Sequence, residues 1–391
     1  MRVYEKSYIK INAEIENGKV QLIPQGTLSQ VARPIIKRIN KIFLEEKPIS
    51  VEDQIIFSSW APPVPSTAFD RLISALIAAV MKKRVPDQAS IGITMRCPNN
   101  CIHCGAADII AGPEPTLDEV NRIIDESIEL GTYLISFDGG EPMLRSDLAD
   151  MVRHVDKSKA IAISFTSGYG LSAEKAKELK NAGLYAVLIS LDSPDQKEHD
   201  RIRGRTGCYE DVMNGISNSL DAGLLTGLFV VVTPDNIDDL EEFYNLAQDK
   251  GIHEISLYEI VAVGRWLDHE SETINSNDVA RLARFQQEKN KLKDGPRVIA
   301  FPYFMGPDMF GCFAGKRWVH ITSGGDVLPC AYTPLSFGNV RNEPLKDIWK
   351  RIGKEPVYKK SAPSCLMRDP GFRAKYIHTI PKDARMPFIM R

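Results

Sequence analysis

The sequence has few cysteines, no long apolar run and no excess of either charge. Seven cysteines among 391 residues are too few for a disulfide framework, and an odd number cannot all pair within one chain. The 49 basic and 51 acidic side chains nearly cancel, which predicts no general affinity for nucleic acid. The longest apolar run, LISALIAAVM, is about half of the roughly 20 residues in a membrane-spanning helix. The first ten residues hold a basic residue but no apolar run, so the sequence predicts no secretory signal. The chain is therefore expected in the reducing cytoplasm.

From residue 90 onward, short apolar segments alternate with amphipathic ones. This alternation predicts β/α units on a parallel sheet, and hence the α/β class. Periodicity alone leaves open a partial (β/α)6 TIM-like barrel or a doubly wound sheet, and in both the functional groups lie at the C-terminal ends of the strands. The six strands are expected at residues 90–95, 133–137, 160–165, 185–191, 226–232 and 253–260.

Two helices of this core carry signals at their ends. Thr116 followed by Glu119 predicts a capping box before the second strand. The helix from Ser172 to Ala182 is expected to end at Gly183, because glycine readily takes the left-handed C-cap conformation. With a region before this core and a glycine- and aromatic-rich region after it, we expect three domains. They are residues 1–88, residues 89–295 and residues 296–391.

The N-terminal region is predicted to end in an apolar helix over residues 66–83. Six apolar side chains fall on one stripe, followed by Lys82, Lys83 and Arg84. This helix either packs against the barrel, which we favour, or lies at a membrane surface with its basic end near anionic headgroups. The preceding 60 residues are a candidate domain for recognising a carrier peptide. The residues of the stripe are Phe69, Leu72, Ile73, Leu76, Ile77 and Val80.

The strongest motif is CPNNCIHC, directly after the first strand, which places Cys97, Cys101 and Cys104 in eight residues. Three thiolates on one loop favour an iron-sulfur cluster or zinc. Structural zinc needs four ligands, so the alternative to a cluster is a zinc knuckle completed by His103 or a distant cysteine. A [4Fe-4S] cluster held by this loop keeps one iron open for another ligand.

The Cx3Cx2C loop after a first strand resembles the signature of the radical S-adenosylmethionine (SAM) superfamily, over roughly residues 89 to 265. The resemblance implies that the open iron chelates SAM and that one electron cleaves SAM to methionine and a 5'-deoxyadenosyl radical, which abstracts hydrogen. His103 occupies a position where the superfamily often has an aromatic facing the adenine; the alternative is a loop residue that faces solvent.

Motifs after the later strands resemble the same superfamily. The DGGEP stretch, with Gly139, Gly140, Glu141 and Pro142, matches the motif for the methionine amine; glycines allow close backbone approach, and a carboxylate can accept an ammonium. By resemblance, Ser190 contacts the ribose or methionine, and Arg203 the carboxylate of SAM. As an alternative, His199, Asp200 and the neighbouring arginines brace the next helix. Weaker matches are Thr166-Ser167-Gly168, Thr233 with Asn236, and Gly264-Arg265.

A second cysteine group follows the core. Cys312 and Cys330, with Gly325 five residues before Cys330, resemble the opening of a SPASM or twitch extension, and Cys365 is the only later cysteine. These three thiols are expected to hold a second, auxiliary [4Fe-4S] cluster, although ordinary core thiols remain an alternative. The fourth ligand is either substrate or another residue. The candidates are Asp369, His378 and Cys208, although Cys208 is expected to be a buried thiol at a helix start.

Three functions remain open at this point. The first is a radical SAM enzyme that oxidises a peptide or protein side chain, reduced by a low-potential donor such as ferredoxin or flavodoxin. The second applies the same chemistry to a lipid, tetrapyrrole or other cofactor precursor, with peripheral membrane contact. The third is a non-catalytic SAM-binding sensor or electron carrier. No catalytic side chain is identified, although Tyr258, Glu259 and Arg265 are expected at the barrel mouth, with Glu259 in a surface salt bridge.

Overall fold

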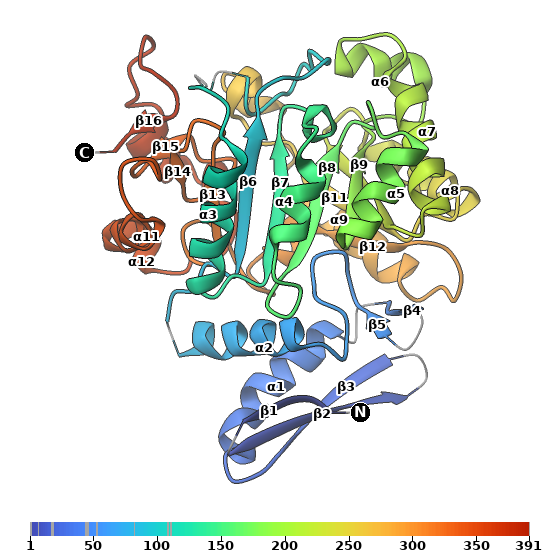
Figure 1. The fold of residues 1–391 in the computed structure, drawn as a ribbon, viewed down its shortest axis with the longest axis vertical. Helices are drawn as coiled ribbons and strands as arrows, with labels where there is room; N and C mark the ends of the chain where they lie inside the picture. The colour runs from blue at the N-terminus through green and yellow to red at the C-terminus, as the bar shows by residue number, and fades with distance from the viewer. Residues whose placement is uncertain are drawn as a thin grey trace.

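A sheet of nine strands forms the centre of the molecule (Figure 1). The computed structural model describes residues 2–6, 8–16, 19–43, 47–51, 54–81, 83–107, 109 and 112–390. Six parallel strands, β6 to β11, lie in the order of the chain without a reversal. A doubly wound sheet reverses its order, so the sheet is that of a partial barrel. The strands are β6 (Gln88–Thr94), β7 (Leu134–Gly139), β8 (Ile161–Thr166), β9 (Ala186–Ser190), β10 (Leu225–Val232) and β11 (Glu254–Glu259).

Two helices between these strands have the end signals that the sequence predicts. Helix α3 (Leu117–Glu129) has both hydrogen bonds of the capping box between Thr116 and Glu119. Helix α5 (Ala173–Ala182) ends at Gly183, which has a φ of 89°. Both predictions are confirmed, as are all six strands to within two residues of each bound. The other helices of the core are α4 (Leu148–His154), α6 (Gln196–Arg203), α7 (Cys208–Asp221), α8 (Leu240–Asp249) and α9 (Ser276–Lys289).

The C-terminal region extends the barrel sheet at both edges. Strand β12 (Arg297–Ala300) is parallel to β11, and β13 (Trp318–Ile321) is parallel to β6 and antiparallel to β14 (Val327–Leu328). Its apolar side chains share one core with the barrel, so we propose residues 296–391 as an extension of the barrel rather than a separate core. Its other elements are β15 (Leu335–Ser336), β16 (Phe388–Ile389), α10 (Phe301–Phe304), α11 (Leu345–Lys354), α12 (Pro356–Lys359) and α13 (Pro370–Phe372).

The N-terminal region lies beyond the N-terminal ends of the barrel strands (Figure 1). Three antiparallel strands, β1 to β3, form a small sheet, and α1 packs beside β3. A short hairpin, β4 and β5, leads to α2 under the barrel. The bounds are β1 (Arg2–Lys6), β2 (Ile9–Glu16), β3 (Lys19–Gln25), α1 (Ser29–Phe43), β4 (Ile49–Val51), β5 (Gln54–Ile56) and α2 (Thr67–Val80).

The apolar stripe of α2 is covered by the barrel. Phe69 and Ile73 are almost fully buried in one cluster with Leu134 and Leu188, from the strands above. Packing against the barrel is therefore confirmed, and a membrane-facing stripe is wrong. At the end of the helix Lys82 lies outside the described residues, while Arg84 donates from Nε to the carbonyl of Gly315 over 3.0 Å.

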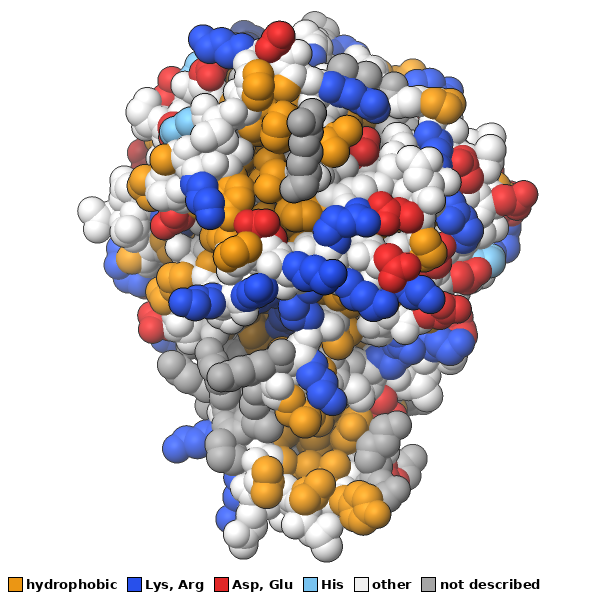
Figure 2. All heavy atoms as spheres, turned by 90° about the vertical axis from the view of Figure 1, so that its left-hand side faces the viewer, with side chains coloured by type: hydrophobic (Ala, Val, Ile, Leu, Met, Phe, Trp, Pro, Cys, Tyr) orange, Lys and Arg blue, Asp and Glu red, His pale blue; other side chains and the backbone are white. Residues whose placement is uncertain are grey.

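The face of the molecule that is seen from the C-terminal region carries charges of both signs near α2 (Figure 2). Seen from the C-terminal region, Lys and Arg side chains mixed with Asp and Glu cross the molecule between the barrel and the N-terminal region (Figure 2). No helix among the described residues has both the length and the apolar character to cross a membrane. The lipid alternative thus loses the apolar stripe that suggested it.

Candidate functional site

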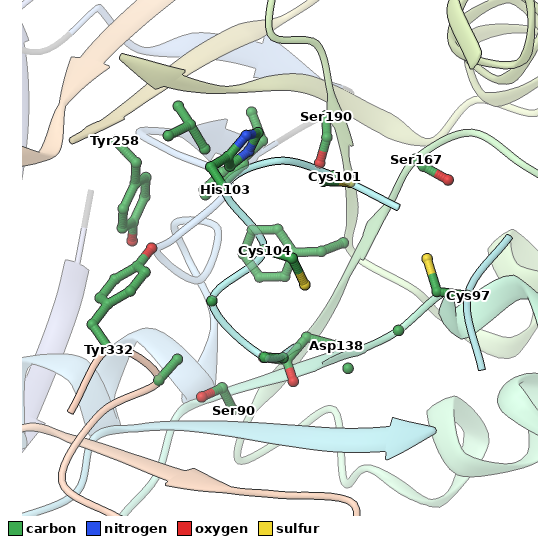
Figure 3. Close-up of a pocket in the computed structure, with 18 of the residues that line it drawn as sticks. Ser90, Cys97, Cys101, His103, Cys104, Asp138, Ser167, Ser190, Tyr258 and Tyr332 are labelled. Carbon is green, nitrogen blue, oxygen red and sulfur yellow. The ribbon is translucent and has the colours of Figure 1, made fainter. Parts of the chain in front are cut away.

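A cavity of about 440 Å³ opens at the C-terminal ends of the barrel strands (Figure 3). Its volume is within the usual range for small-molecule sites. The loop after β6 brings Cys97, Cys101 and Cys104 to the wall of this cavity. Gly140 comes from the end of β7, Ser190 from the end of β9 and Glu259 from the end of β11. Residues from all three predicted regions, Trp60 and Tyr332 included, line it. The site that the strand pattern predicts is therefore present at the expected end of the sheet.

The cysteine loop is held by the backbone on two sides. Arg265 donates from Nη1 to the carbonyl of Cys101 over 2.8 Å and from its backbone N–H to that of Cys104 over 3.1 Å. Gly264 has a φ of +57°, and a Cβ there would lie 2.3 Å from the Cys104 oxygen. Asn100 on the loop donates to the carbonyl of Arg203 over 2.9 Å. The Gly-Arg turn after β11 thus supports the loop, and only glycine allows this approach.

The three thiols suit an iron-sulfur cluster by their chemistry. Burial raises the pKa of the Cys101 thiol, and the thiol protons must leave when a metal binds. In the part of the chain that the structure describes, no three His, Cys, Asp or Glu side chains already stand as ligands of a single ion. Each thiolate of a [4Fe-4S] cluster binds a different iron, so the three sulfur atoms lie further apart than the ligands of one ion. An iron-sulfur cluster therefore does not require three side chains placed around a single point. Cysteine donors alone favour iron-sulfur ligation.

The glycines of the DGGEP motif press against the strand that carries the cysteine loop. A Cβ at Gly139 would lie 2.2 Å from the Thr94 oxygen, and one at Gly140 2.2 Å from the Arg96 oxygen. The carboxylate of Glu141 is buried and accepts hydrogen bonds from the Thr166 hydroxyl over 2.7 Å and from the backbone N–H of Ser167 over 2.8 Å. The motif therefore offers backbone to the cavity, while the carboxylate joins β7 to β8 and Pro142 starts a 3-10 turn.

A charged group closes the end of β9 beside the cysteine loop. The Arg203 Nε lies 2.7 Å from Asp192 Oδ2, and the His103 Nε2 lies 3.6 Å from the same oxygen. Burial would raise the pKa of Asp192, but the charge of Arg203 holds it below its ordinary value. Arg203 also donates from Nη1 to Cys101 Sγ over 3.7 Å. The His103 side chain is only 12% exposed and lines the cavity, so a solvent-facing loop residue is wrong.

Other residues of this segment brace α7, as the alternative interpretation expects. The Asp200 carboxylate accepts from the backbone N–H of Gly207 over 2.7 Å and of Tyr209 over 2.9 Å. His199 Nδ1 accepts from the backbone N–H of Asp192 over 3.1 Å. Cys208 is the first residue of α7 and 1% exposed. The interpretation of Cys208 as a buried thiol at a helix start is confirmed.

The opposite wall carries residues that the motifs did not single out. Asp138 is the second-last residue of β7, its Oδ1 is buried without a hydrogen-bond partner, and its Oδ2 lies 3.9 Å from His320 Nδ1. His320 Nδ1 is 2.8 Å from the Ser90 hydroxyl. Figure 3 shows Tyr258 and Tyr332 pointing toward one another at the side of the cavity. A carboxylate at the end of a strand, just before the glycines, was the available signal for Asp138.

The N-terminal region also reaches this wall. Trp60, in the loop between β5 and α2, donates from Nε1 to the Ser256 hydroxyl over 3.0 Å. Its ring lies 5.8 Å from that of Tyr258 and 4.7 Å from that of Phe301. The neighbouring Ser59 hydroxyl donates to Glu254 over 2.6 Å, which anchors the loop at the start of β11. An aromatic floor for the cavity thus comes from outside the barrel.

Replacing Asp138 with asparagine is expected to stabilise the protein most at high pH. Burial raises the pKa of Asp138 from 3.8 to about 7, so the wild type loses stability as the pH rises through this interval. His320, whose pKa burial lowers to about 4, and Tyr332, whose pKa is raised well above 10, stay neutral between pH 5 and pH 8. Three pKa units correspond to about 4 kcal/mol. Urea unfolding should show a gain approaching this value at pH 8 and a much smaller one at pH 5; equal gains would contradict the assignment.

The second cysteine group gathers where the C-terminal region crosses the barrel mouth. Burial raises the pKa of Cys330 to about 12, with the nearby Cys312 thiol adding to the effect. Burial and the thiols of Cys312 and Cys330 also raise the pKa of Cys365. The Cys330 Sγ lies 3.3 Å from the Thr333 hydroxyl. The backbone N–H of Cys312 donates to the Ala362 carbonyl over 2.9 Å, and that of Gly315 to the Pro329 carbonyl over 2.7 Å. The segments that carry the three cysteines are therefore neighbours in the fold.

The residues named as candidate fourth ligands are engaged elsewhere. Asp369 accepts from the backbone N–H of Phe372 over 2.6 Å and caps α13. His378, about half exposed, lies 2.6 Å from Glu270. Cys208 lies beside Asn99 of the first cysteine loop, with its Sγ 3.2 Å from the Asn99 Oδ1. Sequence spacing supports none of the three, and neither do these contacts.

Comparison with known proteins agrees with both cysteine groups. Residues 91–247 match the Radical SAM superfamily model, and residues 312–369 match the SPASM model, an iron-sulfur cluster-binding domain. The PqqA peptide cyclase of Streptomyces rochei is 30% identical over 272 residues, which are 66% of this chain and 74% of that protein. The chain belongs to the radical SAM superfamily. An AdoMet-dependent heme synthase of Methanosarcina barkeri (strain Fusaro / DSM 804) is 26% identical over 302 residues, 71% of this chain and 83% of that one.

Solved structures support the fold of this radical SAM enzyme. Streptococcus suis SuiB bound to precursor peptide SuiA matches with a TM-score of 0.59 at 16% identity, over 92% of this chain and 90% of that one. Native anSMEcpe with bound AdoMet matches with a TM-score of 0.54 at 15% identity, over 68% and 82%. The partial barrel and the C-terminal extension are thus confirmed. The cofactors of this radical SAM enzyme are SAM, the [4Fe-4S] cluster that binds it and an auxiliary iron-sulfur cluster.

Proposed function

We propose that this enzyme oxidises a side chain of a peptide or protein. Cys97, Cys101 and Cys104 hold the cluster that binds SAM, and a reduced ferredoxin or flavodoxin supplies the electron. When bound, the cluster and SAM provide a 5'-deoxyadenosyl radical that abstracts hydrogen from the substrate. The observation that carries the proposal is the cavity, in which the three thiols and an aromatic, carboxyl-bearing wall face one space of about 440 Å³.

The wall near the cysteines is built to position SAM. The backbone of Gly139 and Gly140 offers carbonyl oxygens for the methionine ammonium, because the Glu141 carboxylate is already occupied. His103, held beside Asp192, presents its ring to the adenine. Ser190 offers its hydroxyl, and Arg203 provides a cation for the carboxylate of SAM. Placing both reactants in one enclosed site is the main contribution that the protein makes to such a reaction.

The remaining wall favours a side chain over a large anionic ring. A cavity of about 440 Å³ must admit SAM as well as the reacting part of the substrate, which leaves room for a group of side-chain size. Asp138, whose Oδ1 is buried without a hydrogen-bond partner, faces this space. A propionate entering beside it would meet like charge when the Asp138 carboxyl ionises. The aromatic rings of Trp60 and Tyr258 instead suit an apolar or hydrogen-bond-donating side chain.

The N-terminal sheet is the candidate surface for the rest of a peptide substrate. Strands β1 and β3 are its edges, and an extended peptide can add to such an edge. Hydrophobic side chains gather at the far end of this region (Figure 2), and exposed ones include Tyr8, Leu28 and Val31. The match to SuiB, a structure solved with a precursor peptide, extends over 92% of this chain.

A tetrapyrrole substrate is the second candidate. The first relatives by sequence are named AdoMet-dependent heme synthases, and one is named Fe-coproporphyrin III synthase, at 26% identity over 293 residues. The acidic wall of the cavity opposes this substrate, whereas the sequence similarity favours it. Both candidates keep the same radical initiation, so one assay separates them.

Release of 5'-deoxyadenosine tests the proposal. The full chain is reconstituted anaerobically with iron and sulfide, reduced, and mixed with SAM and either a mixed-sequence peptide pool or Fe-coproporphyrin III. We expect the peptide pool to raise 5'-deoxyadenosine release at least about tenfold, or 1.4 kcal/mol of barrier, together with peptides that have lost hydrogen. Stimulation by the porphyrin alone would overturn the peptide proposal. The Trp60→Ala variant should lose the stimulation while keeping the substrate-free release.

A further inference from the structure

The auxiliary cluster lacks one protein ligand. Cys312, Cys330 and Cys365 supply three thiolates, and the described contacts engage the candidates named from the sequence elsewhere. We infer that Glu259, the last residue of barrel strand β11, is the fourth ligand. The inference rests on the proposed assignment of these cysteines to an auxiliary cluster, and it goes beyond that assignment by naming a carboxylate from the barrel.

Glu259 lies beside the segments that carry the three cysteines. Its side chain is about 5% exposed and lines the cavity. Arg368, which is paired with the Glu259 carboxylate, donates its backbone N–H to the carbonyl of Cys365 over 3.1 Å. The ring of Tyr258, the residue before Glu259, lies 6.2 Å from that of Tyr332, two residues after Cys330. The expected salt bridge of Glu259 is therefore present, but it is buried beside the cysteine segments rather than at the surface.

Arg368 provides the charge that a carboxylate ligand needs here. Its Nη1 lies 3.1 Å from Glu259 Oε2, with the arginine side chain about one-fifth exposed. Arg368 stands three residues after Cys365. Three thiolates and a carboxylate carry the same charge as four thiolates, and a buried carboxylate needs a cationic or metal partner. Arg368 therefore balances the charge that Glu259 brings to this buried space.

The topology explains why sequence spacing cannot find this ligand. Glu259 ends β11 at the barrel mouth, whereas the cysteines belong to loops of the C-terminal region that follow α10, β14 and α12. The sheet runs from β12 at one edge to β14 at the other, and only closure of the barrel brings these segments together. With Glu259 bound, all four irons have protein ligands. In this arrangement the auxiliary cluster has no open iron for substrate, so the inference favours a protein ligand over a substrate ligand.

The test compares Glu259→Ala and Glu259→Cys in the anaerobically reconstituted full chain. Iron is counted, and the oxidised protein is examined by electron paramagnetic resonance. We expect about eight irons in the wild type. Glu259→Ala should fall to about seven, with the signal of a three-iron cluster, or to about four if the whole auxiliary cluster leaves. Glu259→Cys should return to about eight without that signal, because a thiolate replaces the carboxylate. Asp138→Asn, which removes another carboxyl from the same cavity, is the matched control and should keep about eight.

Two outcomes would overturn the inference. One is a Glu259→Ala protein with about eight irons and an unchanged spectrum. The other is loss of iron in Glu259→Ala that Glu259→Cys does not restore, since this would indicate a structural role. Failure of the underlying assignment looks different: a protein without Cys312, Cys330 and Cys365 would then keep as much iron as the wild type.

Discussion

A Cys101→Ala variant should lose reductive cleavage of SAM by more than about 100-fold. Even the loss of an outer-shell partner of a metal ligand costs roughly 10–100-fold, and Cys101 is proposed as a direct ligand. The backbone around it is held by Arg265 and by α6, so removing the thiol should leave the loop in place. Anaerobic assays of 5'-deoxyadenosine, with iron counts falling from about eight to about four, measure the effect.

The matched control is Cys208→Ala. This thiol is buried at the start of α7 and lies 3.2 Å from Asn99, a residue of the same cysteine loop. It is assigned to neither cluster, so its removal should leave iron content and SAM cleavage close to the wild type. Equal losses in Cys101→Ala and Cys208→Ala would show that the loop tolerates no change of thiol, and the ligand assignment would fail.

Local patterns of the sequence predicted the core well. Each barrel strand is an apolar run that is buried along its length, and helix ends such as Thr116 and Gly183 have signals within four residues. Strand order was open, because alternation is the same in a barrel and in a doubly wound sheet. The pairing of β13 with β6 and of β12 with β11 joins segments far apart in the chain, which no local pattern records.

The candidate site also has one part that the sequence predicts and another that depends on the fold. The cysteine loop is a motif of eight residues, and its position after the first strand placed it at the cavity. In contrast, Asp138, His320 and Trp60 meet there from three separate elements. The carboxylate of Glu141, which lines the cavity, also joins β7 to β8, a contact that its motif does not predict. Spacing identifies chemistry that lies within one loop, whereas the substrate wall depends on tertiary contacts.

Replacing Cys312, Cys330 and Cys365 together with alanine should remove one cluster and spare the other. Iron should fall from about eight to about four per chain, while SAM cleavage without substrate continues, because the first cysteine loop is anchored by Arg265 and α6 and not by these thiols. Oxidised substrate should no longer form if the auxiliary cluster takes part in the oxidation.

This second variant complements Cys101→Ala, since the two should lose different clusters. Cys101→Ala should keep the spectrum of the auxiliary cluster and lose SAM cleavage, and the triple variant should do the reverse. Three buried thiols leave small cavities when truncated, and the hydrogen bond of Cys330 with Thr333 is lost as well, so a triple serine variant of similar volume separates packing from ligation. Serine should bind iron too weakly to keep the cluster. A triple variant that retains about eight irons would show that these cysteines are core thiols, and the chain would then operate with the SAM-binding cluster alone.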